Sequence, residues 1–123
     1  MEIVARASLK EAVNTIRTNE AGKDLLIVGI EDCHACRALK EDAGLIAEGL
    51  DLNRLILANL IINDNDELES IADLRLTDVP ATYLFERGSV VGGWFGYDHD
   101  REQSFRTLAL RTAISNKLAL VAS

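Results

Sequence analysis

Apolar residues recur every three or four positions in several stretches of the chain, a spacing that gathers them on one face of a helix. The stretches with this spacing predict helices over residues 8–22, 33–48, 64–74 and about 98–118. Ser8 and Glu11 have the spacing of a capping box at the start of the first helix. Asp98 or Asp100 can cap the last one, because a short carboxylate accepts hydrogen bonds from free backbone amides. The pattern therefore predicts four helices.

Short apolar runs lie between the predicted helices and indicate strands. Two of them, residues 25–30 and 55–62, are almost entirely apolar, which is typical of strands covered on both faces of a parallel or mixed sheet. The other predicted strands are residues 2–5, 81–86 and 89–95, of which the last two form a hairpin at Arg87-Gly88. Strands that alternate with helices and end in a hairpin predict an α/β fold with a central mixed sheet of about five strands. The whole chain, residues 1–123, is expected to form a single domain.

The composition narrows the classes of protein to which the chain can belong. Of the 123 residues 48% are hydrophobic, which excludes a disordered chain, and the net charge of −7 disfavours binding to nucleic acid. The longest apolar runs are too short to span a bilayer, and residues 1–20 lack the basic start and apolar block of a signal peptide. We therefore expect a cytoplasmic protein without a nucleic-acid or membrane partner.

The candidate chemistry lies in the only two cysteines, Cys33 and Cys36. They follow a predicted buried strand and open a predicted helix. The free amides and the macrodipole at a helix N-terminus favour an anion, so Cys33 should have a lowered thiol pKa and act as the nucleophile. Cys36 lies one turn into the helix and is expected to be the more buried, resolving thiol. His34 adds a possible cation beside Cys33 that would tune the thiolate.

A close cysteine pair is also compatible with a zinc site or with an inert pair. Zinc needs more ligands than two thiolates, and the candidates are His34 and His99. His99 lies far away in the sequence, in a polar loop. We therefore expect no metal and no bound cofactor, with the cysteine pair itself as the redox centre. An inert pair stays open as an alternative.

Three segments of the chain resemble the thioredoxin family. They are Cys33-His34-Ala35-Cys36, Val79-Pro80-Ala81-Thr82, and the segment 83–91 that runs into Gly92 and Gly96. The resemblance covers nearly the whole chain and implies a thioredoxin fold, with four helices flanking the sheet. It also implies that Pro80 follows a cis peptide bond and faces the cysteine pair, and that Val79 pairs with the backbone of the substrate.

The chain departs from the thioredoxin pattern around the cysteines. Asp32 stands where thioredoxins have tryptophan, and His34-Ala35 replaces Gly-Pro. Ile27 occupies the place of a buried aspartate that assists deprotonation of the second cysteine, and Asn59 or Ile61 lies near the place of the usual lysine. A cation between the cysteines would stabilise the thiolate and hence the reduced form. We therefore expect a disulfide less reducing than that of thioredoxin.

The expected function is that of a thiol–disulfide oxidoreductase. Cys33 would attack a disulfide, and Cys36 would resolve the mixed disulfide. The predicted substrate groove consists of Val79, Pro80, Gly92 and Gly93. Expected partners are protein disulfides or dithiols and small thiols, with a reductase or a small thiol as the electron donor. The alternative is a non-catalytic thioredoxin-fold binding or assembly module, or a redox-sensing accessory subunit.

Overall fold

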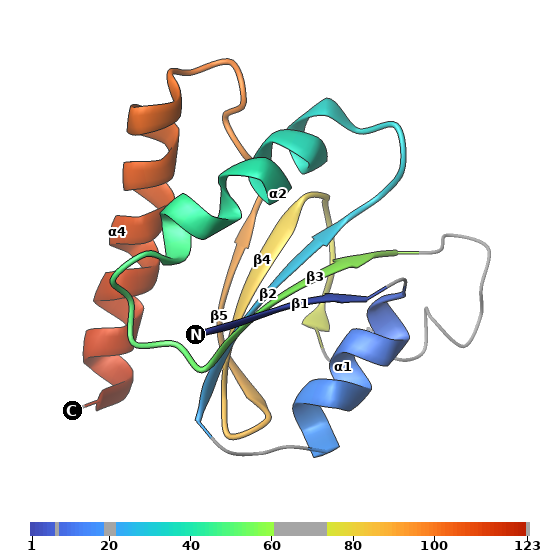
Figure 1. Cartoon of the computed structure of the whole chain (residues 1–123), viewed down its shortest axis with the longest axis vertical. Coiled ribbons are helices and arrows are strands. Elements are labelled where there is room, and N and C mark those ends of the chain that lie inside the picture. The colour runs from blue at the N-terminus through green and yellow to red at the C-terminus, as the bar shows by residue number, and fades with distance from the viewer. Residues whose placement is uncertain (7, 19–21, 61–73, 123) are drawn as a thin grey trace.

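The computed structural model describes residues 1–6, 8–18, 22–60 and 74–122. These residues contain five strands and three helices (Figure 1). The strands are β1 (Glu2–Arg6), β2 (Lys23–Gly29), β3 (Arg54–Asn59), β4 (Ala81–Glu86) and β5 (Ser89–Phe95). The helices are α1 (Leu9–Thr18), α2 (His34–Ala47) and α4 (Gln103–Ala122). The predicted helix over 64–74 lies, except for Leu74, outside the described residues.

The strands form one mixed sheet in the order β1-β3-β2-β4-β5. β1, β3 and β2 run parallel, whereas β4 is antiparallel to both β2 and β5. The predicted central mixed sheet of about five strands is thereby confirmed for the described part of the chain. The predicted strand over 55–62 begins at Arg54 and ends at Asn59, and residues 61 and 62 lie outside the described residues.

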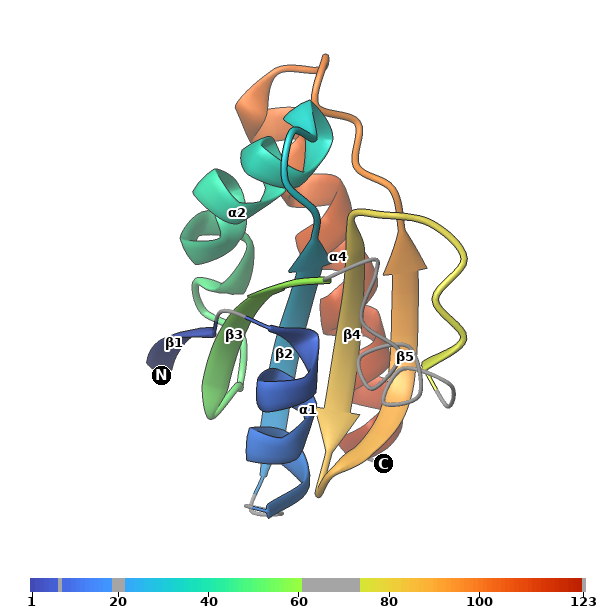
Figure 2. The same ribbon diagram turned by 90° about the vertical axis from the view of Figure 1, so that its right-hand side faces the viewer.

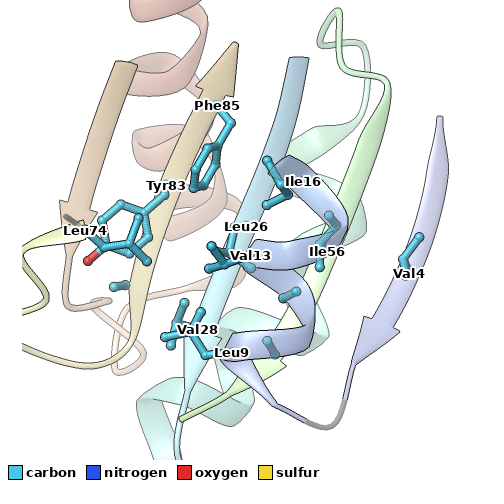
Figure 3. Close-up of a cluster of buried hydrophobic side chains, with 13 residues drawn as sticks. Val4, Leu9, Val13, Ile16, Leu26, Val28, Ile56, Leu74, Tyr83 and Phe85 are labelled. Atoms are coloured by element: carbon cyan, nitrogen blue, oxygen red, sulfur yellow. The ribbon is translucent and has the colours of Figure 1, made fainter. Parts of the chain in front are cut away.

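Helices cover both faces of the sheet, so the central strands are buried on both sides (Figure 2). In β2, Leu26 and Val28 point into the cluster under α1, which Figure 3 shows. Leu25 and Ile27 point the other way, into the cluster under α2 and α4. This two-sided burial is the physical reason why the strand has no polar alternation.

The start of α1 and both ends of α2 agree with the sequence. The predicted end of the first helix at residue 22 cannot be compared, because the last described residue of α1 is Thr18 and residues 19–21 lie outside the described residues. The amide of Glu11 donates to the Ser8 hydroxyl oxygen at 3.2 Å, as expected for a capping residue. Helix α2 has Cys33 as its N-cap and Glu48 as its C-cap, which are the two ends that the apolar spacing predicts.

The start of the last helix differs from the prediction. Neither Asp98 nor Asp100 caps it, because α4 begins at Gln103 and the Glu102 carbonyl accepts the amides of Phe105 and Arg106, each at 3.0 Å. The Asp98 carboxylate instead pairs with Arg101 at 2.9 Å, and its carbonyl accepts the Arg101 amide at 3.1 Å. These contacts close a separate turn before the helix. At its other end, α4 continues past residue 118 to Ala122.

Two exposed glycines near the end of α2 offer a test of the helix boundary. A Cβ atom added at Gly44 or Gly49 would meet no described atom within 4 Å, but Gly49 has a left-handed φ of +78°. Gly44→Ala should stabilise the protein by about 1 kcal/mol, because alanine favours the helix. Gly49→Ala should destabilise it by about 1–2 kcal/mol, because an L residue is strained there. Urea unfolding of both variants checks this, and shifts of the same sign would contradict the boundary.

Candidate active site

Cys33 and Cys36 form a disulfide at the N-terminus of α2, with their Cα atoms 5.2 Å apart. Cys33 has an extended backbone (φ −119°, ψ 112°), and its sulfur accepts a hydrogen bond from the Cys36 amide at 3.2 Å. The sulfur thus takes the place of the oxygen of an ordinary N-cap side chain. After reduction, the same amide and the helix macrodipole would stabilise a thiolate on Cys33.

The two sulfurs differ in their access to solvent. Cys33 is partly exposed, whereas Cys36 is 2% exposed and packs beneath the first turn of α2. A disulfide partner from solution can therefore approach Cys33 and not Cys36. The His34 side chain is exposed on the same turn, where it can add positive charge near Cys33 when protonated.

The turn into α2 depends on Asp32. Its φ is 57°, in the left-handed region, which among L residues aspartate and asparagine tolerate best. This conformation reverses the chain shortly after β2 and presents Cys33 as the N-cap of α2. Asp32 and Glu31 both extend into solvent.

Pro80 lies at the same end of the sheet as the cysteines. The antiparallel register pairs Val28 with Ala81, so β2 ends where β4 begins (Figure 2). The Val79–Pro80 peptide bond is cis, as the resemblance implied. Ile30 lines a depression of about 160 Å³ together with both cysteines, and a second one of about 270 Å³ together with Val79. The cysteine turn and the segment before Pro80 therefore share a wall.

The glycine beside Pro80 is Gly96, and not Gly92 or Gly93. Gly96 donates its amide to the Pro80 carbonyl at 2.7 Å and has a left-handed φ of +81°. Gly92 and Gly93 pair with Leu84 and Tyr83 in the middle of the β4–β5 ladder. A register shift between Leu84 and Phe85 moves the end of β5 by one residue. The sequence alone gave no sign of this bulge.

Ile27 leaves the region behind the cysteines apolar. It is fully buried in the cluster between the sheet and α2, and it pairs with Leu57 on β3 and Thr82 on β4. A polar contact lies farther along, where Lys40 of α2 donates to the side-chain oxygen of Asn59 at the end of β3. Burial lowers the pKa of Lys40. The spacing of four residues from Cys36 could have drawn attention to this lysine.

A buried carboxylate ties α2 to the loop that follows β5. The Asp42 side chain has no exposed surface and accepts hydrogen bonds from Tyr97 (2.6 Å), Gln103 (2.9 Å) and Arg106 (2.6 and 3.2 Å). Burial opposes ionisation, but the hydrogen bonds from Arg106, Gln103 and Tyr97 outweigh it and lower the pKa of Asp42. Because Tyr97 follows Gly96, this network fixes the loop next to Pro80.

The described residues hold no group of three or more His, Cys, Asp and Glu side chains that could bind a metal ion. His99 lies beside Asp100, with a nitrogen–oxygen distance of 3.4 Å. In the same part of the chain, no helix is both long and apolar enough to cross a membrane.

Comparisons with solved structures identify the architecture. Thioredoxin pre-protein from Schistosoma mansoni matches with a TM-score of 0.60 at 12% identity, over 91% of this chain and 98% of that one. This chain has the thioredoxin fold. Mitochondrial thioredoxin 3 from Saccharomyces cerevisiae (TM-score 0.60, 16% identity) covers 93% of this chain and 94% of its own. Spinach chloroplast thioredoxin F matches with a TM-score of 0.58 at 18% identity, over 93% of this chain and 95% of that one. No protein-family model and no curated protein matches the sequence.

The Asp42 network generates a stability prediction. Asp42→Asn leaves the Arg106 guanidinium without its carboxylate, and we expect a loss of about 3 kcal/mol at neutral pH. The pKa of Asp42 is lowered on folding, so its contribution is complete above about pH 4 and disappears as the pH falls through the folded-state pKa. Urea unfolding at neutral pH and at a pH below the folded-state pKa of Asp42 should show a gap between wild type and variant that narrows in acid.

The matched control is Asp51→Asn, which removes a carboxylate that is 94% exposed and 3.5 Å from Lys23. It should cost less than about 1 kcal/mol. Equal losses in the two variants would contradict a special role for the Asp42 network.

Proposed function

We propose that this protein is a thiol–disulfide oxidoreductase that exchanges disulfides with protein or small-thiol substrates through Cys33 and Cys36. The observation that carries the proposal is the partly exposed Cys33 sulfur at a helix N-terminus, which accepts the Cys36 amide at 3.2 Å. A thiolate at this position is both a better populated nucleophile and a better leaving group than an ordinary thiol.

Exchange would proceed in two balanced steps. The Cys33 thiolate attacks one sulfur of the substrate disulfide, so that bond breaks and the other substrate sulfur leaves as a thiolate that takes a proton from water. The Cys36 thiolate then attacks the Cys33 sulfur, the mixed disulfide breaks, and the second substrate sulfur leaves in the same way. The substrate disulfide gains two electrons and becomes a dithiol, and the two cysteines supply those electrons as they form the Cys33–Cys36 bond. The reverse sequence oxidises a dithiol.

The substrate groove would lie between the cysteine turn and the segment before Pro80. The depression of about 270 Å³ there is lined largely by apolar side chains, namely Ile30, Leu60, Leu76 and Val79. The glycine beside Pro80 is Gly96, rather than Gly92 or Gly93, because the Gly96 amide bonds to the Pro80 carbonyl. A glycine there has no side chain that would cover the backbone next to Pro80. An extended substrate segment could pair with the Val79 backbone and place an apolar side chain in this depression.

The Val79 amide, which such pairing would use as a hydrogen-bond donor, is already bonded to Asp78. The Asp78 carboxylate accepts the Val79 amide at 2.9 Å, so a substrate backbone must displace it. Asp78→Ala should free the amide and lower the KM for a peptide disulfide about two- to fivefold, with little change in kcat. Steady-state kinetics check this. A raised KM would contradict substrate pairing at Val79.

The proposed system needs no bound cofactor, because the Cys33–Cys36 pair is itself the redox centre. Its substrates would be protein disulfides or dithiols, and a reductase or a small thiol would return the electrons. A cytoplasmic location stays a prediction, since two of the similar folds belong to a mitochondrial and a chloroplast protein.

Insulin reduction with dithiothreitol as the electron source tests the proposed activity. We expect catalysed turnover by the wild type, none by Cys33→Ser, and a stable mixed disulfide with Cys36→Ser. Absence of turnover with dithiothreitol, glutathione or a reductase would overturn the proposal and favour the non-catalytic binding module or the redox-sensing subunit.

Equilibrium with glutathione tests the tuning by His34. We expect a potential less reducing than about −270 mV, the value of thioredoxin, because a cation near Cys33 stabilises the reduced form. The neutral variant His34→Ser should be more reducing than the wild type. A wild-type reduction potential near or below about −270 mV would contradict this expectation.

A further inference from the structure

Lys40 shares the depression that contains the two cysteines. It lies one helical turn after Cys36 on α2, and the two residues line the same hollow of about 160 Å³. A Cβ atom built at Gly29 of β2 would lie 3.4 Å from the Cys36 sulfur and 3.4 Å from the Lys40 ε-carbon. The Cys36 sulfur and the Lys40 ε-carbon are therefore at most twice 3.4 Å apart. The lysine side chain therefore lies in the same neighbourhood as the buried sulfur.

Neighbouring residues hold Lys40 in this position. A side chain at Gly29 would come within 2.9 Å of the Cys36 β-carbon, so the glycine leaves the space in which Lys40 and Cys36 meet. At the far wall, the Lys40 ammonium donates to the side-chain oxygen of Asn59, which is fixed at the end of β3. The hydrogen bond to Asn59 thus orients the cation.

A nearby cation would help the buried Cys36 thiol to ionise. Cys36 is 2% exposed, and burial in apolar surroundings disfavours a thiolate. Yet the second step of exchange requires the thiolate of Cys36. Among the neighbouring side chains, Ile27 is apolar and β3 contributes the neutral Asn59, so neither supplies a charge.

The other charged groups around Cys36 are exposed. Glu31 and Asp32 on the turn carry the wrong sign, and Arg37 extends into solvent, where charges are strongly screened. His34 is exposed as well. Lys40 is half-buried, so its field is less screened than those of the others. Burial lowers the pKa of Lys40, which indicates that the amine is partly shielded from water.

We propose that the ammonium group of Lys40 stabilises the thiolate of Cys36 and thereby sets how fast Cys36 resolves the mixed disulfide. In this step the Cys36 thiol gives its proton to water, and its thiolate forms the bond to the Cys33 sulfur. The mixed disulfide breaks, and the substrate sulfur leaves with the electron pair and takes a proton from water. Lys40 keeps its proton throughout, so it acts through Cys36 as a positioning residue. The inference rests on the proposed function.

The test measures the pKa of Cys36 directly and does not depend on turnover. In a Cys33→Ser background, Cys36 is the only thiol, and ultraviolet absorbance of its thiolate is followed against pH. Lys40→Met should raise the pKa of Cys36 by about one unit, which is about tenfold less thiolate at neutral pH. Lys40→Gln, which can still bond to Asn59, should give the same rise. Lys40→Arg keeps the charge and should restore most of the wild-type value.

The matched control is Lys117→Met. Lys117 packs against Gly92 on β5, away from the cysteine end of the sheet, and this variant should leave the pKa of Cys36 unchanged. An unchanged pKa in both neutral Lys40 variants would overturn the inference, as would a rise that Lys40→Arg does not reverse. Insulin reduction by the wild type is measured separately, so failure of the proposed function is distinguished from failure at Lys40.

Discussion

The antiparallel pairing of β2 with β4 is the constraint on which the candidate site depends. β2 is buried on both faces, and its register with β4 pairs Val28 with Ala81. One residue beyond each partner, the chain continues into Gly29 on one side and Pro80 on the other. A shift of register by one residue would turn every side chain of β2 to the opposite face, so the packing of both clusters fixes the register. The position of Pro80 relative to the cysteine turn is therefore a consequence of core packing.

The two sulfurs of the candidate site have different electrostatic environments. Cys33 has solvent access, a backbone donor and the helix N-terminus, which favour an anion through the backbone alone. Cys36 is buried and lacks this access to solvent, and Ile27 leaves its strand-side neighbourhood apolar. In the proposed resolving step, the half-buried Lys40 in the same depression compensates for this. Placing the cation on α2 also keeps it on the same rigid helix as the thiol.

Local features of the site could be predicted from the sequence because their causes are local. The spacing of the cysteines, the apolar run before them and the helical pattern after them require only neighbouring residues, and the structure has α2 between the expected caps. The cis bond before Pro80 followed from the family resemblance and is confirmed. The five-stranded mixed sheet followed from the alternation of strands and helices.

Features that depend on tertiary pairing could not be predicted in the same way. The bulge between Leu84 and Phe85 adds one residue to β5, which brings Gly96 and not Phe95 beside Pro80. The start of α4 depends on contacts between Asp98 and Arg101 that compete with helix capping. Asp42 resembles a solvated helix residue in sequence, and only the arrival of Arg106 and Tyr97 explains its burial.

The proposed exchange requires Cys33, and not Cys36, to be the reactive thiolate. It is tested most directly by alkylating the reduced wild-type protein with iodoacetamide across a range of pH and measuring the modification of each cysteine by mass spectrometry. We expect Cys33 to react first, with an apparent pKa below about 8.5, while Cys36 stays largely protected. Equal reactivity of the two cysteines, faster reaction of Cys36, or a Cys33 pKa at or above about 8.5 would contradict it.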